Sequence, residues 1–450
     1  MRAIATAITL LVLSGCAAYT AKPLRKPALA DLRSPTQSAL AQAARRLRVP
    51  GMSPIALNFR KPLTGKELGV IAVLANPALR ALRARARIAR AQVFAAGLLP
   101  DPVIQFSALQ PYGAGAAGHT VALADGFLWD LSSLVTRATN IRQAKAHAMA
   151  IHYEIAWREW VAANRARLTA RRLYWLGQDW EMARKAEVLW GPHGALLAQD
   201  ARAHLISGAK ALAWEAAWDR LRVKTAALHR AWARTRFNLN KQLGLPPDAV
   251  PVIAPPTTTV PPPGSARQLF HGALARRLDL IALVSAYHSA DSALLRAVLD
   301  QYPRLSLGFA GARDTSGLNQ AGIQLSLVLP LFNRGRGAVA VARARRAALF
   351  KGYVARLAEA RSQIYGLWAR DRSLAREIRG LKGRSRALSR LAQAANRAYR
   401  AHALGLFPYL ALMQESLAMH LQMTDLRLSR AAADIALQTA TGTPWSSSRS

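Results

Sequence analysis

The sequence predicts a mainly α-helical chain with a small β section, built from two copies of one structural unit. Pro102 opens an alternating apolar run that leads into a long Ala/Arg-rich segment, and the same order recurs about 200 residues later from Pro303. Neither long segment, 136–190 or 337–402, contains proline. Helices over them would be roughly 80 and 100 Å long, because a helix rises 1.5 Å per residue. Such lengths are typical of coiled coils and helical barrels.

The amino terminus has the layout of an export signal. Arg2 precedes an apolar stretch over 3–13 that is too short for a stable membrane anchor. The four residues that end at Cys16 resemble a bacterial lipobox, in which the cysteine becomes the lipidated first residue of the mature protein. We therefore expect a signal peptide over 1–15 and a covalent lipid on Cys16. The alternative is an ordinary signal peptide whose cysteine is incidental.

Composition and periodicity divide the chain into six segments. We expect the signal peptide 1–15, an N-terminal segment 16–70, a first repeat 71–244, a Pro-rich linker 245–265, a second repeat 266–442 and a flexible tail 443–450. Period-two alternation predicts strands at about 102–112, 119–130, 303–312 and 321–331. Apart from a helix at about 266–300, we expect long helices at about 136–190, 195–243, 337–402 and 406–441.

Four strands cannot close a transmembrane barrel. The smallest known barrels have about eight strands, and an open sheet edge in lipid leaves backbone groups unpaired. If these strands enter a membrane, the chain has to oligomerise, and three copies would supply twelve strands. A small soluble sheet covered by helices is the alternative reading.

Two turns far from the strands are the candidate functional ends. Each contains glycine, which permits a reversal, and proline, which begins a return helix. The residues concerned are Gly191, Pro192, His193 and Gly194 in the first copy, and Gly405 and Leu406 in the second. Asp200 and Glu415 follow these turns in a chain that is poor in acids. They are candidates for a gate if they face a common axis, and a solvated, cation-paired helix face is the alternative.

The charge is strongly basic, with 62 Lys and Arg against 24 Asp and Glu and a net charge of +38. Nucleic acid is a poor partner candidate, because the arginines are spread along helices and the export signal takes the chain out of the cytoplasm. Lipid phosphates, an acidic medium and compositional bias remain open explanations. We expect no enzyme, cofactor or metal site, since no catalytic or phosphate-binding motif emerges and the histidines His193 and His402 lack ligand spacing. Cys16 is the only cysteine.

Several segments together resemble the TolC-like outer-membrane efflux protein family, over about residues 70 to 442. Asn76-Pro77 stands at the start of a predicted helix. The segments 98–102 and 301–303 lead into predicted strands, and 329–335 follows the end of one. The segment 273–280 is also similar, although Leu278 stands where that family usually has proline. Each fragment alone is a weak signal, and their order and twofold recurrence carry the resemblance.

The resemblance implies a homotrimer with a twelve-stranded outer-membrane β-barrel, four strands per chain, continuous with a long α-helical barrel in the periplasm. The chain would be a lipid-anchored, membrane-spanning protein of a Gram-negative bacterium, in contact with outer-membrane lipid. Its partners would be a periplasmic adaptor, met by the tip residues, and an inner-membrane RND-type pump. The 16–70 segment and the linker would wrap the equator of the helical barrel. The implied function is a passive efflux duct, for heavy-metal cations or drugs. A duct for type I protein secretion and a structural trimeric lipoprotein are the alternatives.

Overall fold

The computed structural model describes residues 19–21, 34–116, 118–257 and 261–445. The chain divides into two units, Met1–Pro35 and Thr36–Ser450, and the second contains all the elements described below. The predicted signal peptide and Cys16 lie outside the described residues. Among the described helices, none has an apolar stretch long enough to span a bilayer.

The strands form one antiparallel sheet in the order β1-β2-β3-β4, and the prediction of four strands is confirmed. Their bounds are β1 (Val103–Leu109), β2 (Ala122–Asp130), β3 (Arg304–Arg313) and β4 (Asn319–Val328). Each repeat supplies one hairpin, and pairing of β2 with β3 joins the two. Among the described residues β1 and β4 are the edges of the sheet, so each leaves one row of backbone groups without a strand partner there.

The two faces of the sheet differ in chemistry. One face carries a row of large apolar side chains across all four strands, and each of them is exposed. This apolar row consists of Ile104 (61%), Phe127 (41%), Phe309 (67%) and Ile323 (76%), paired in register. The next row lies on the opposite face and has small or polar residues: Gln105, Gly126, Ala310 and Gly322. The sheet therefore has one face suited to lipid and one suited to water.

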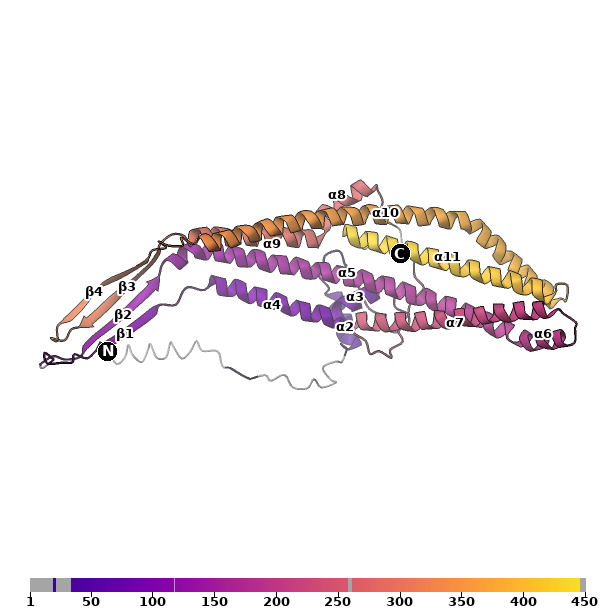
Figure 1. Cartoon of the computed structure of the whole chain (residues 1–450), viewed down its shortest axis with the longest axis horizontal. Coiled ribbons are helices and arrows are strands. Elements are labelled where there is room, and N and C mark those ends of the chain that lie inside the picture. Colours follow the sequence, from indigo (N-terminus) through magenta and orange to yellow (C-terminus); the bar gives the residue numbers. More distant parts are fainter. Residues whose placement is uncertain (1–18, 22–33, 117, 258–260, 446–450) are drawn as a thin grey trace. The chain divides into compact units, whose positions relative to one another are not determined.

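Two very long helices follow the hairpins, as the sequence predicts. They are α5 (Ser132–Trp190) of 59 residues and α10 (Arg336–Arg400) of 65 residues, roughly 90 and 100 Å long. Asp130 at the end of β2 starts α5 by accepting a hydrogen bond from the Ser132 N–H at 2.9 Å. The helices α4 (Pro77–Gly97) and α7 (Gly208–Leu243) pack on α5. Between the two long helices, α9 (Leu278–Leu299) contacts both, and α11 (Leu406–Thr441) packs on α10 and α5 (Figure 1).

Two helices that the sequence predicts as continuous are each broken in two. The expected helix over 195–243 is α6 (Pro192–Arg202) followed by α7, with a turn between them. The expected helix over 266–300 is α8 (Ala266–Arg276) followed by α9, because Arg277 has an extended backbone with φ −72° and ψ 106°. Arg277 is fully buried, so its side-chain contacts hold the break in place.

The largest core surrounds the middle of α5 and draws on segments far apart in sequence. Helices α2 (Gln37–Arg45) and α3 (Gly65–Ala75) pack there, and Leu63 forms a parallel β-bridge with Ile253 of the linker. The predicted flexible tail over 443–450 is corrected in part. Trp445 is buried, and its indole N–H donates to Asn164 Oδ1 at 3.0 Å. Residues 446–450 lie outside the described part of the chain.

Candidate functional site

The second-copy turn lies at the end of the helices remote from the sheet (Figure 1). Helix α10 ends at Arg400, and His402 adopts a left-handed backbone with φ 57°. The Ala403 N–H donates to the Ala398 carbonyl at 2.8 Å and the His402 N–H to Tyr399 at 3.0 Å, which is the Schellman arrangement. Gly405 then precedes α11, which begins at Leu406. The predicted residues Gly405 and Leu406 therefore lie at this tip.

The first-copy turn lies elsewhere than the sequence predicts. Gly191 has helical angles, φ −51° and ψ −47°, and Pro192 merely divides α5 from α6. The chain reverses after α6, where His204 has φ 57° and the Leu205 N–H donates to the Asp200 carbonyl at 2.9 Å. This is the same cap as at His402. The sequence did contain a signal for it, since Arg-Ala-His occurs both at 202–204 and at 400–402.

Neither Gly191 nor Gly194 reverses the chain, and only Gly194 is needed for close packing. A Cβ on Gly194 would lie 2.7 Å from Cζ3 of Trp214 and would overlap that indole. A Cβ on Gly191 would lie at an ordinary 3.4 Å from Trp218. Both indoles belong to an aromatic cluster near the tips, which we call the tip cluster. Its rings are Trp190, Trp214, Trp218, Tyr399 and Tyr409.

The tip cluster connects the two repeats. Tyr399 of α10 stacks on Tyr409 of α11 with ring centroids 4.4 Å apart and planes at 3°. His193 of α6 meets the edge of Tyr399 at 6.0 Å, so a predicted tip residue of the first copy touches the second. Aromatic contacts of this kind are each worth about 0.5–1.5 kcal/mol beyond burial. The cluster therefore fixes the position of α6 against α10.

Replacing Gly194 with alanine is expected to destabilise the protein by about 1–3 kcal/mol, because the added methyl forces the Trp214 indole to move in a packed cluster. Gly191→Ala is the matched control, since its methyl finds ordinary contact distances and alanine favours a helical backbone. Thermal unfolding of both variants in detergent, followed by circular dichroism, measures the difference. Equal melting temperatures for the two variants would contradict this account of Gly194.

Asp200 and Glu415, the predicted gate residues, lie on α6 and α11. Asp200 is half-buried and Glu415 is exposed. Within the described residues neither carboxylate has a cation within ion-pair distance, so the pairing of Asp200 with Arg202 is not seen. Their role in gating stays a prediction.

Two hollows follow one stripe of α5, and we call them together the α5 groove. The first, of about 990 Å³, lies between α5, α9, α10 and α11, and the second, of about 590 Å³, lies between α5, α7 and α11. On α5 most of their lining residues recur singly or in neighbouring pairs every three or four positions, which places them on one helix face. They are residues 147, 150, 151, 154, 157, 158, 161, 164, 165, 168, 172, 176, 179 and 190.

Basic side chains outnumber acidic ones along the α5 groove. Its exposed Lys and Arg side chains are Arg158, Arg165, Arg172, Arg220 and Lys224, and its exposed carboxylates are Glu154 and Asp425. Only Arg158 among these cations has a carboxylate within 4 Å in the described part of the chain, Glu154 at 3.5 Å. Sequence reasoning missed this surface because arginines spread evenly along a helix give no local motif.

Asp179 is the most deeply buried acid of the groove. Its side chain is 7% exposed, Oδ1 accepts no hydrogen bond, and the nearest cationic group is His420 Nε2 at 3.6 Å. Burial raises the pKa of Asp179 to about 6, and the charge of Asp425 acts in the same direction against the Thr424 hydroxyl and Lys224. Burial also lowers the pKa of His420, with help from Arg427. The pair is therefore less charged near pH 6 than exposed residues would be.

The pKa of Asp179 predicts a pH dependence of stability. Because its folded pKa lies above the unfolded value, the carboxyl stabilises the fold most below about pH 4, and this contribution is lost as pH rises through about 6. In Asp179→Asn the loss is absent, so the melting temperature of the variant minus that of the wild type should rise between pH 4 and pH 7. His420 titrates in both proteins and cancels to first order. A difference that is constant or falls over this range would contradict the assignment.

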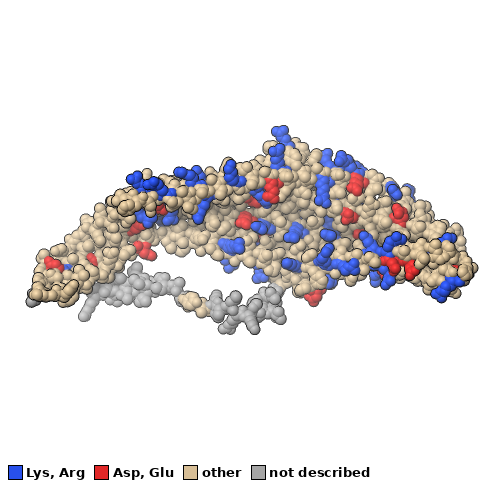
Figure 2. Space-filling model, viewed as in Figure 1, with Lys and Arg blue, Asp and Glu red and all other residues tan. Residues whose placement is uncertain are grey.

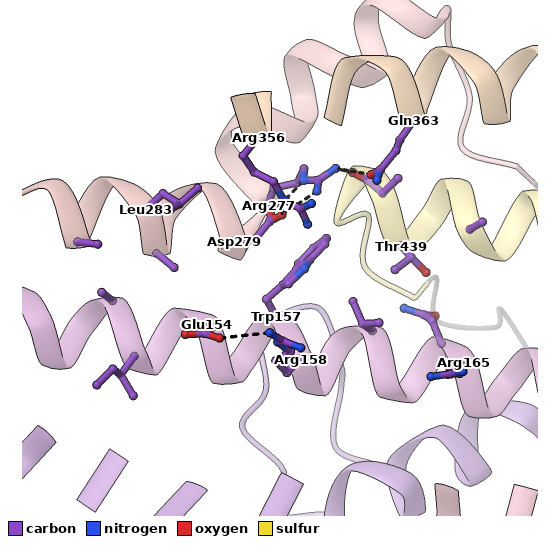
Figure 3. A pocket seen from close by; sticks show the side chains of 18 of the residues that line it. Glu154, Trp157, Arg158, Arg165, Arg277, Asp279, Leu283, Arg356, Gln363 and Thr439 are labelled. Carbon is purple, nitrogen blue, oxygen red and sulfur yellow. Dashed lines mark hydrogen bonds and ion pairs between the residues drawn. The ribbon is translucent and has the colours of Figure 1, made fainter. Parts of the chain in front are cut away.

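Arg277 forms a buried ion-pair network at the edge of the groove (Figure 3). Its guanidinium donates to both carboxylate oxygens of Asp279, at 3.0 and 2.7 Å, and to the Ala440 carbonyl at 3.3 Å. It also lies 4.9 Å from the Trp157 ring, and Arg356 donates to Asp279 at 2.7 Å. The network ties the start of α9 to the end of α11, to α10 and to α5.

The described residues include no group of three or more His, Cys, Asp and Glu side chains placed to hold a metal ion.

No protein-family model and no curated protein matches the chain in sequence. Solved structures do match in fold. The outer-membrane channel OprN has a TM-score of 0.70 at 17% identity, over 84% of this chain and 90% of that one. CusC has 0.68 at 16% identity, over 88% and 96%, and the Campylobacter jejuni channel CmeC has 0.69 at 14% identity, over 86% and 87%. Mainly α-helical with four antiparallel strands, the chain has the TolC-like outer-membrane channel fold.

Proposed function

We propose that the chain is the outer-membrane exit duct of a tripartite efflux system and conducts solutes passively from the periplasm to the exterior. One observation carries the proposal: the four-stranded sheet has two unpaired edges and one exposed apolar face at the end of very long helices. An isolated sheet of this kind leaves backbone groups unpaired in lipid, whereas three copies close it into twelve strands. The likeness to solved outer-membrane channels supports the same reading.

In this assembly β1 of one protomer pairs with β4 of the next, and the apolar row faces lipid. Cys16 carries a lipid anchor, and the helical ends remote from the sheet point into the periplasm. There they meet a periplasmic adaptor, which links the duct to an inner-membrane RND-type pump. The contact residues on the first-copy side lie around His204, because the reversal is there, with Gly405 and Leu406 on the second-copy side.

Deletion of the gene in its native host tests the function. Efflux predicts a higher intracellular concentration of a tracer solute, which a plasmid copy restores. Loss of a secreted protein with unchanged solute accumulation would favour type I secretion instead. No change in either would favour a structural trimeric lipoprotein. Sedimentation of the detergent-solubilised protein as a trimer is required in all three cases, and a monomer would rule out the duct.

Asp200 and Glu415 belong to the proposal as gate candidates near the periplasmic mouth. Three copies of each around an axis would repel one another and attract cations. Planar-bilayer recordings of the Asp200→Ala, Glu415→Ala double variant test this role. Open probability and ion selectivity identical to those of the wild type would remove both residues from the gate.

A further inference from the structure

We infer that the α5 groove forms the wall of the duct at mid-height and makes the duct select anions over cations. This inference rests on the proposed function and adds the class of solute. The observations behind it are the side of α5 on which the groove lies, the curvature of that side, and the balance of exposed charge along it.

The groove lies on the face of α5 opposite α3. Residues of α5 in the core with α3 include Trp160, Ala163 and Ala170, while the groove uses Arg158, Val161, Arg165 and Leu168. Since each residue advances about 100° around a helix, the two sets lie roughly 170° apart. Helices α2 and α3 therefore cover one side of the helical layer, and the groove opens on the other.

That other side is concave. The first hollow is lined by both α5 and α10, although α9 lies between them, and the second by both α7 and α11, with α5 between them. Helices on either side of a central one can line the same hollow only where the layer curves toward it. When three such layers close into a duct, their concave sides enclose the lumen.

The exposed charge of this concave side is positive. The groove of each chain has five exposed cations and two exposed carboxylates, and a trimer contains three copies of this groove. Figure 2 shows the same excess of Lys and Arg over Asp and Glu across the face in view. Charges of one sign on the wall of a confined space concentrate ions of the opposite sign.

The pattern argues against a duct specialised for metal cations. Of its two poorly exposed carboxyls, Asp179 has a raised pKa that keeps part of it neutral near pH 6, and Asp279 is already paired with Arg277 and Arg356. Its floor is apolar at Trp157, Val161 and Leu283, so the first hollow accommodates organic groups as well as charge. Anionic solutes, including those with an apolar part, fit this wall better than hydrated metal ions do.

Reversal potentials of the purified trimer in a planar bilayer test the inference. With a KCl gradient between about 0.03 and 0.1 M, where the Debye length is about 10 Å or more, chloride should permeate better than potassium. Arg165→Glu with Arg172→Glu should lower the chloride-to-potassium permeability ratio about threefold or more. Arg46→Glu with Arg48→Glu is the matched control, because both arginines are exposed next to α2, on the α3 side. That pair should leave the ratio unchanged.

The outcomes separate the inference from the function beneath it. A wild-type trimer that conducts but prefers potassium overturns the inference and leaves the duct intact. An unchanged ratio in Arg165→Glu, Arg172→Glu, or an equal drop in the control pair, overturns the assignment to the groove. A wild-type trimer that fails to conduct even after a periplasmic adaptor has been added to open its mouth would contradict the proposed function itself.

Discussion

Ile323→Arg is expected to prevent stable assembly in the outer membrane. Ile323 belongs to the apolar row of the sheet and is 76% exposed, in register with Phe309 on the next strand. In the proposed trimer this row faces lipid. An arginine on the lipid face costs about 2–4 kcal/mol at the bilayer midplane, and the cost recurs in each of three protomers. Assembled trimer in outer-membrane fractions should fall at least tenfold, as measured by heat-modifiable migration on gels.

Gln324→Arg is the matched control, because Gln324 is the next residue of the same strand and points to the opposite face. There the side chain is in register with Gly308 and lies beside Gly126, on the face of the small and polar residues, which in the proposed trimer lines water. We expect this variant to assemble at close to the wild-type level and to fold normally. Equal loss of trimer in both variants would mean that the sheet does not have a lipid face, and equal survival would mean that it does not enter the membrane.

The sheet shows what a single sequence can and cannot predict. The second hairpin alternates clearly at Leu305, Leu307 and Phe309, so its strands and their apolar face follow from the sequence. The first hairpin is blurred, because Asp125 and Gly126 interrupt its pattern, and β2 begins at Ala122, later than predicted. The register between hairpins depends on pairing over about 180 residues, which alternation alone does not specify.

The tips show how one residue type can have two physical roles. Gly191, Pro192 and Gly194 fit the chemistry of a turn, but their backbone is helical, and the small size of Gly194 makes room for the Trp214 indole. The true turns use histidine, at His204 and His402, in a left-handed conformation that usually selects glycine. The turn preference of glycine and proline therefore placed the first-copy tip about ten residues before the actual reversal at His204. The repeated Arg-Ala-His triplet was the better guide, since equivalent turns recur in an internal repeat.

Tertiary contacts explain the remaining differences. The tail was predicted to be mobile because it is short and Ser-rich, yet Trp445 packs in the largest core and stacks under the Arg167 guanidinium at 4.8 Å. Likewise the α8–α9 break has no proline at Leu278. The buried side chain of Arg277 sets it instead, through partners more than 80 residues away in sequence. Such partners are not visible from local pattern.

Arg277→Ala is expected to destabilise the fold by about 3–5 kcal/mol per chain, because it removes one partner of a buried ion pair. Arg277 is fully buried, and Asp279 is 11% exposed. Burial by itself raises the pKa of Asp279, but hydrogen bonds and charges from Arg277 and Arg356 outweigh it and hold that pKa below its ordinary value. The network therefore stabilises the fold above about pH 4, and this contribution is lost as pH falls through the folded pKa of Asp279.

Arg356→Ala is the matched control, because Arg356 donates to the same carboxylate at 2.7 Å but is 30% exposed. It should cost about 1 kcal/mol or less, since water can replace a partly exposed guanidinium. Thermal unfolding of both variants in detergent, at pH 7 and then at decreasing pH below 4, measures the two costs. The gap between the variants should narrow only as pH falls through the lowered folded pKa of Asp279, because the protonated carboxyl no longer needs a cation. A small effect of Arg277→Ala at pH 7 would contradict the assignment and would show that the ion pair contributes little to stability.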